Sequence, residues 1–78
     1  SGSLENPKQV VKTVSPQKQA YKCVANVLNV RRAPNTYSEV IGVLKKGQYV
    51  DVYEVNNGFG RIYYDGDTGY VSMKYLSY

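Results

Sequence analysis

The sequence predicts a small all-β domain of five to six short antiparallel strands, folded as a partly open barrel or as two orthogonally packed sheets. Two observations lead to this prediction. Apolar and polar residues alternate over short runs, as they do in strands with one buried face. Turn-forming Gly, Asn, Asp and Pro residues separate these runs. The chain has 78 residues, which is enough for one small domain.

The first 19 residues differ in composition from the rest of the chain. They include two prolines and no aromatic residue, and they show no sustained period. Ser1-Gly2-Ser3 looks like a cloning remnant. We therefore interpret residues 1–19 as a cloning remnant and flexible linker, and residues 20–78 as the folded domain.

The first half of the domain contains three predicted strands. They cover residues 21–25, 28–31 and 40–44, where short apolar patterns favour extended backbone. A loop over residues 33–38 separates the second strand from the third, because Pro34 cannot donate a hydrogen bond to a sheet. Lys45-Lys46-Gly47 then turns the chain.

The second half begins with the clearest strand, over residues 48–55. Its alternation predicts inward-facing valines, Val50 and Val52, and outward-facing tyrosines, Tyr49 and Tyr53. Asn56-Asn57-Gly58 is a hairpin signal, since Asn and Gly tolerate the positive φ of tight hairpin turns.

The predicted partner strand covers residues 59–64. Asp65-Gly66-Asp67 forms the next turn, and residues 68–72 form the last full strand. Residues 72–76 are too few for an ordinary helix. They predict a terminal 3-10 turn that lets Leu76 close the core.

The composition excludes several kinds of site within this chain. It has no His and a single Cys, Cys23, which rules out a Cys/His zinc cluster, an internal disulfide and a nucleophile–histidine pair. Cys23 alternates with core positions and is predicted to be a buried small hydrophobe. The acids fall in turns or on exposed strand faces, unlike the paired carboxylates of glycosidases. We predict no catalytic residue, no metal and no cofactor.

The charge balance gives no case for nucleic acid or membrane insertion. The net charge is +4, and residues 20–78 carry seven Lys/Arg against five Asp/Glu, or +2. Nucleic-acid binding usually needs a clustered basic stripe. A small barrel can also bind single-stranded nucleic acid by stacking aromatic rings on its bases, and this is the third function that we consider for the sequence. The sequence has no apolar run of about 18 residues, the length that a membrane span requires.

The order of motifs resembles the bacterial SH3 domain. Leu28-Asn29-Val30-Arg31 is followed by Pro34, and the similarity continues to Leu76. The further matching segments are Val40-Ile41-Gly42-Val43-Leu44, Lys46-Gly47, Val50-Asp51-Val52, Phe59-Gly60-Arg61-Ile62, Gly69-Tyr70-Val71 and Tyr75-Leu76. The sequence departs from the family at Ala33, where Gly is usual, and at Phe59 and Tyr70, where Trp is usual.

This resemblance implies an SH3-like barrel and a non-catalytic module that binds peptidoglycan or its stem peptide. Such modules hold a larger secreted protein, for example a wall hydrolase or autolysin, at the bacterial cell wall or surface. We expect the isolated domain to be monomeric. The alternative is a protein–protein interaction module that binds a proline-rich or other peptide, since tyrosine-lined grooves suit polyproline helices.

Nine tyrosines, all between Tyr21 and Tyr78, supply most of the candidate ligand contacts. Their rings can stack on sugars or alkyl chains, and their hydroxyls can bond peptide groups. The alternative is that they pack the sheets, because Tyr has a high β-propensity. The predicted ligand-binding residues are Asn29, Arg31, Tyr37, Tyr49, Tyr53, Tyr63, Tyr70 and Tyr75, with Tyr64 as a further candidate.

Two sets of charged residues leave their roles open at this stage. Arg31 either pairs with a carboxylate of the stem peptide or braces the following loop. An amine of the ligand could bind to Asp51, Asp65 or Asp67. The alternative for Asp65 and Asp67, which flank Gly66, is that they are ordinary turn residues.

Overall fold

The structure is a computed structural model that describes residues 18–78. The strands are β3 (Gln19–Cys23), β4 (Val27–Arg31), β5 (Val40–Lys45), β6 (Tyr49–Val52), β7 (Glu54–Asn56), β8 (Phe59–Tyr64), β9 (Asp67–Ser72) and β10 (Leu76–Ser77), and the 3-10 turn η1 (Met73–Tyr75) precedes β10. The predicted all-β class and the terminal 3-10 turn are therefore confirmed. Residues 1–17, most of the predicted linker, lie outside the described residues.

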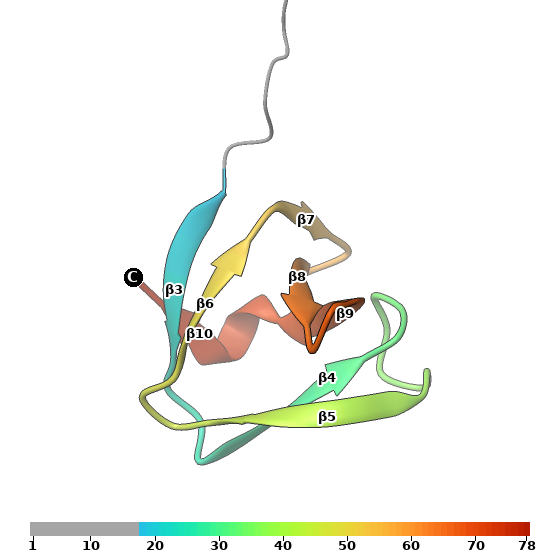
Figure 1. The fold of residues 1–78 in the computed structure, drawn as a ribbon, viewed down its shortest axis with the longest axis horizontal. Helices are drawn as coiled ribbons and strands as arrows, with labels where there is room; N and C mark the ends of the chain where they lie inside the picture. The colour runs from blue at the N-terminus through green and yellow to red at the C-terminus, as the bar shows by residue number, and fades with distance from the viewer. Residues whose placement is uncertain (1–17) are drawn as a thin grey trace, which may run out of the picture.

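The strands form two antiparallel sheets around one core. One sheet has the order β10-β3-β6, and the other has the order β5-β4-β9-β8-β7. Figure 1 shows β3 and β6 side by side at the left, with β4 and β5 along the bottom of the view. The chain thus closes into a small barrel.

Both predicted hairpin turns are confirmed. Asn57 and Gly58 have φ values of 56° and 76°, and they join β7 to β8 with Asn56 opposite Phe59. The turn between β8 and β9 repeats this geometry, with φ values of 53° at Asp65 and 86° at Gly66. Two successive positive φ values match the right-handed twist of the flanking strands, which is why Asn, Asp and Gly are favoured there.

Seven buried side chains from both sheets form the core: Cys23, Leu28, Val30, Leu44, Val52, Ile62 and Val71. The predicted burial of Cys23 is confirmed, because none of its surface is exposed. A Cβ atom at Gly69 would lie 2.5 Å from Cγ1 of Val30, so β9 approaches the core closely only because this residue is Gly.

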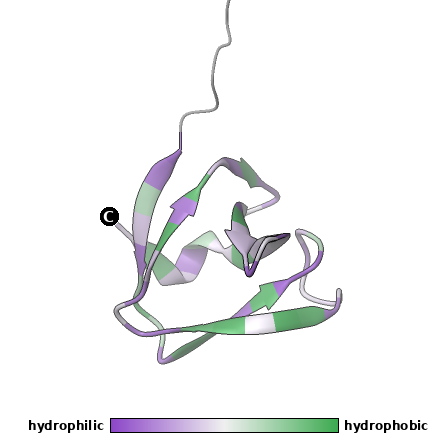
Figure 2. Cartoon of the chain, in the orientation of Figure 1, coloured by the Kyte–Doolittle hydropathy of each residue, from purple (hydrophilic) through white to green (hydrophobic). Residues whose placement is uncertain are grey.

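The alternation in β4 agrees with the predicted pattern. Leu28 and Val30 are buried, whereas Asn29 is exposed. β5 is apolar along most of its length, as Figure 2 shows. It is an edge strand of its sheet, and Val40 remains 43% exposed although Leu44 is buried.

The prediction of one strand over residues 48–55 is wrong. The chain forms two strands there, β6 and β7, which belong to different sheets. β6 pairs with β3, but the amide of Tyr53 donates to the carbonyl of Arg61 in β8, at 2.9 Å. Alternation predicts the face of each residue, and Val52 is indeed buried, but it does not reveal this change of hydrogen-bonding partner.

The end of the chain returns to its first described strand. Leu76 packs against the core, as predicted, and lies opposite Cys23 in the pairing of β10 with β3. The rings of Tyr21 and Tyr78 stack with centroids 5.0 Å apart. A hydrogen bond to Tyr78 raises the pKa of Tyr21 above its usual value, and partial desolvation adds to the shift.

Replacement of Ile62 by Val tests the importance of the core. Ile62 is 1% exposed, so Ile62→Val should lower the free energy of unfolding by about 1 kcal/mol. The control is Val55→Ala in the neighbouring strand, where Val55 is 56% exposed and the change should stay within about 0.5 kcal/mol. Urea denaturation of both variants measures this difference, and equal losses would contradict the packing described here.

Candidate ligand-binding site

The surface of the described residues carries two grooves that share no residue. One, the Arg31 groove, has a volume of about 750 Å³ and is lined by Ala25, Val27, Leu28, Asn29, Arg31, Thr36, Asn57, Gly58, Phe59, Ser72, Met73, Lys74 and Tyr75. The other, the tyrosine groove, has a volume of about 680 Å³ and is lined by Leu44, Gln48, Tyr49, Val50, Asp51, Tyr53, Ile62, Tyr63, Tyr64 and Asp65.

The Arg31 groove brings together three separate parts of the chain. Asn29 and Arg31 come from β4, Phe59 begins β8, and Tyr75 ends η1. Phe59 follows the tight turn at Gly58, and the amide of Met73 donates to the Gly58 carbonyl at 3.0 Å. This bond holds η1 against the start of β8, so the groove has fixed aromatic and aliphatic sides.

Hydrogen bonds fix the loop that borders the Arg31 groove. Nη1 of Arg31 donates to the carbonyl of Ser38 at 2.8 Å. Oδ1 of Asn35 accepts from the Ser38 amide at 2.7 Å, which closes a tight turn within the loop. Nδ2 of Asn57 donates to the Pro34 carbonyl at 3.1 Å and ties this loop to the β7–β8 turn.

These contacts give Arg31 the loop-bracing role that the sequence left open. A guanidinium carries several N–H donors, however, and the bond to Ser38 uses only one nitrogen. Arg31 is half-buried and lines the groove. It therefore has donors left for a planar anionic group such as a carboxylate.

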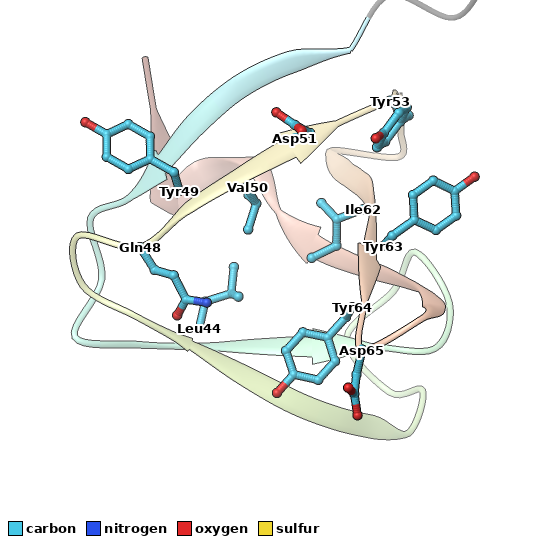
Figure 3. Close-up of a pocket in the computed structure, with 10 residues that line it drawn as sticks. All are labelled: Leu44, Gln48, Tyr49, Val50, Asp51, Tyr53, Ile62, Tyr63, Tyr64 and Asp65. Atoms are coloured by element: carbon cyan, nitrogen blue, oxygen red, sulfur yellow. The ribbon is translucent and has the colours of Figure 1, made fainter.

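The tyrosine groove lies between β6 and β8, as Figure 3 shows. Leu44, Val50 and Ile62 lie in its middle, and in this view Asp51 lies above Val50 and Ile62 while Asp65 lies below them. The ring of Tyr64 lies against Gly42 of β5, where any side chain larger than hydrogen would collide with it. The groove thus has an aliphatic floor with polar and aromatic edges.

An arginine-centred cluster forms one edge of the tyrosine groove. Tyr53 and Tyr63 pack edge to face with centroids 5.0 Å apart, and Cζ of Arg61 lies 5.9 Å from the Tyr53 ring centroid. Nε of Arg61 donates to Glu54 at 3.2 Å. The hydrogen bond to Glu54, followed by that to Tyr63, raises the pKa of Arg61 above its usual value, so the guanidinium stays charged.

The two grooves have opposite charge. The residues that line the Arg31 groove include two bases, Arg31 and Lys74, and no acid. Those that line the tyrosine groove include two acids, Asp51 and Asp65, and no base, although Arg61 lies over Tyr53 at its edge and Lys18 pairs with Asp51. The first groove therefore favours anionic ligands and the second favours cationic or neutral ones.

The structure places six of the eight sequence-predicted site residues in the two grooves. Asn29, Arg31 and Tyr75 line the Arg31 groove. Tyr49, Tyr53 and Tyr63 line the tyrosine groove, together with the further candidate Tyr64.

Two predicted site residues, Tyr37 and Tyr70, line neither groove. Tyr37 is 87% exposed in the loop after β4, next to Thr36 of the Arg31 groove. Tyr70 is half-buried within β9, opposite Arg61 of β8. Tyr70 thus packs within a sheet, as the structural reading of the tyrosines proposed.

Sequence reasoning missed several residues of the Arg31 groove. Phe59 is not among the predicted ligand-binding residues, yet it is half-buried and lines the groove. Thr36, Asn57 and Lys74 come from a loop, a turn and η1. The family position of Phe59 was the available signal for a binding aromatic residue. The other three are brought in by tertiary contacts that no local pattern encodes.

Residues 18–78 contain neither a candidate metal-binding cluster nor a membrane-spanning helix. No group of three or more His, Cys, Asp or Glu side chains is arranged to hold a metal ion in this range. No helix among these residues has the length and apolar character needed to cross a membrane.

A small barrel with a basic, aromatic-sided groove defines a binding module, and comparison with known proteins identifies its family. Residues 26–77 match the bacterial SH3 domain, so the chain belongs to that family. The SH3-like barrel expected from the motifs is thereby confirmed. The chain is also 40% identical over 72 residues to a probable endopeptidase p60 of Listeria grayi. The similar region covers 90% of this chain but only 14% of that protein.

The hydrogen bond from Arg31 to the loop can be tested by mutation. Arg31→Gln should lower the free energy of unfolding by about 1 kcal/mol and speed amide exchange at Ser38, because a half-buried charged hydrogen bond is lost. Arg32→Gln is the control, since the Arg32–Glu39 pair is exposed and should contribute less than about 0.5 kcal/mol. If both variants behave alike, Arg31 does not brace the loop.

Proposed function

We propose that this domain is a non-catalytic module that binds the bacterial cell wall through the peptide part of peptidoglycan. The observation that carries the proposal is the Arg31 groove, which combines basic and aromatic side chains and contains no acid. Membership of the bacterial SH3 family supports it. The module would act outside the cell, as a monomer, attached to a larger secreted protein.

The chemistry of the groove suits a stem peptide. Such peptides carry free carboxylates, for which Arg31 supplies a planar pair of donors and Lys74 a mobile positive charge. Phe59 and Tyr75 offer ring faces and edges for the alkyl parts of the ligand. Asn29 adds a side-chain amide that can donate to a peptide carbonyl and accept from a peptide N–H.

Attachment to the wall would raise the local concentration of any linked catalytic domain. The similarity to a probable endopeptidase p60, of which this region is a small part, suggests a wall peptidase or autolysin as the larger protein. A weak site is sufficient for this purpose, because a tethered enzyme meets its substrate at an effective concentration set by the linker.

A protein–protein module remains the second candidate, and Phe59 and Tyr75 are the observation that favours it. Aromatic side chains of this kind also bind polyproline helices. The absence of acids from the groove lining argues against basic proline-rich ligands and for peptides that carry carboxylates.

A chemical-shift titration tests these functions directly. The domain is titrated separately with a stem peptide, a glycan fragment that lacks peptide, a proline-rich peptide and a single-stranded oligonucleotide. The proposal expects shifts at Asn29, Arg31, Phe59 and Lys74 with the stem peptide and a loss of affinity at high salt. A response confined to any of the other three ligands would overturn it.

Replacement of Lys74 provides a matched test of the groove's charge. Lys74→Gln should weaken stem-peptide binding about three- to fivefold, as expected for one exposed ion pair. Lys46→Gln removes the same charge from a turn outside both grooves and should leave the affinity unchanged. Co-sedimentation with purified cell walls should show the same order. Equal losses in the two variants would mean that only net charge matters.

A further inference from the structure

We propose that the tyrosine groove is a second ligand site, and that it takes an alkylammonium group, a primary ammonium at the end of an apolar chain. The proposed wall-binding function uses the Arg31 groove and does not involve this one. The lysine-type side chain of a peptide is the source of such a group that best fits the groove.

Val50 provides the apolar contact in the floor of the groove, because Leu44 and Ile62 beside it have almost no exposed surface. Leu44 and Ile62 are each 1% exposed, and Val50 is partly buried beside them. Figure 3 shows these three aliphatic side chains between the aromatic side chains of β6 and β8. An alkyl chain laid on this floor would cover the exposed part of Val50 and lose contact with water.

The edges of the groove provide the charge. Asp51 and Asp65 are both exposed, and no Lys or Arg is among the lining residues. An ammonium already approaches one of them, because Nζ of Lys18 lies 3.7 Å from Oδ2 of Asp51. This contact shows that the Asp51 carboxylate can pair with an ammonium, here one that comes from the residue before β3.

The tyrosines favour an amine over a flat sugar. Tyr53 and Tyr63 pack edge to face, so they present no shared flat platform. In Figure 3 the rings of Tyr49 and Tyr63 point away from each other, on opposite sides of the groove. The electron-rich face of Tyr64 suits a cation nearby, whereas Arg61 already lies over Tyr53.

The test compares two probes that differ only in the terminal ammonium group. The domain is titrated with Nα-acetyl-lysine methylamide and with Nα-acetyl-norleucine methylamide, while amide chemical shifts are recorded. The lysine probe should shift the amide signals of Val50, Asp51 and Asp65 and leave those of Asn29 and Lys74 unchanged. Its affinity should fall as the salt concentration rises. The norleucine probe should bind at least about fivefold more weakly.

Two variants identify the groups responsible. The double variant Asp51→Asn with Asp65→Asn should lower the affinity for the lysine probe about fivefold or more. The variant should keep the turn, because Asn tolerates the φ of 53° at position 65. Lys18→Gln should strengthen binding, since the chain's own ammonium no longer competes for Asp51. If Lys18→Gln has no effect while the double variant does, the ammonium binds at Asp65 instead.

Three results would overturn the proposal: no shift at the groove up to tens of millimolar probe, equal binding of the norleucine probe, or equal binding to the double variant. None of these affects the stem-peptide titration, which reports on Arg31 and Lys74. Failure of the second site is therefore distinguishable from failure of the proposed wall-binding function.

Discussion

The structure depends on the point at Tyr53 where the chain leaves one sheet and joins the other. Val52 is the last residue of β6 and is buried in the core, and the next amide already bonds to β8. This change of partner brings β6 close to β8 and closes the barrel. It also opens the tyrosine groove, because β6 and β8 line it without pairing as neighbours in a sheet.

The two grooves differ in charge because different elements of the chain line them. β4 and η1 contribute Arg31 and Lys74 to one groove, while β6 and the β8–β9 turn contribute Asp51 and Asp65 to the other. The net charge of the folded part conceals this separation. A module with a basic and an acidic groove is suited to ligands that carry both charges, and peptides with free carboxylates and amines are of this kind.

The strands could be predicted from the sequence where turn chemistry is strong. β8 begins and ends at the predicted residues because Asn57-Gly58 and Asp65-Gly66 require turns on either side of it. The division between β6 and β7 could not be predicted, since alternation gives the face of a residue and not its hydrogen-bonding partner. The candidate site was predicted as one set of residues for the same reason. The closure of the barrel decides which outward-facing side chains come together in one groove.

The pairing of β10 with β3 has a mechanical consequence. Leu76 lies opposite Cys23 and Ser77 opposite Lys22, so the chain leaves the domain toward the end at which β3 begins. The stacking of Tyr21 on Tyr78 places the exit beside the entry. A pulling force applied to the two ends of the domain would therefore act on the same edge of the β3–β10 pair. Such a force would load the hydrogen bonds of this pair one after another rather than all together.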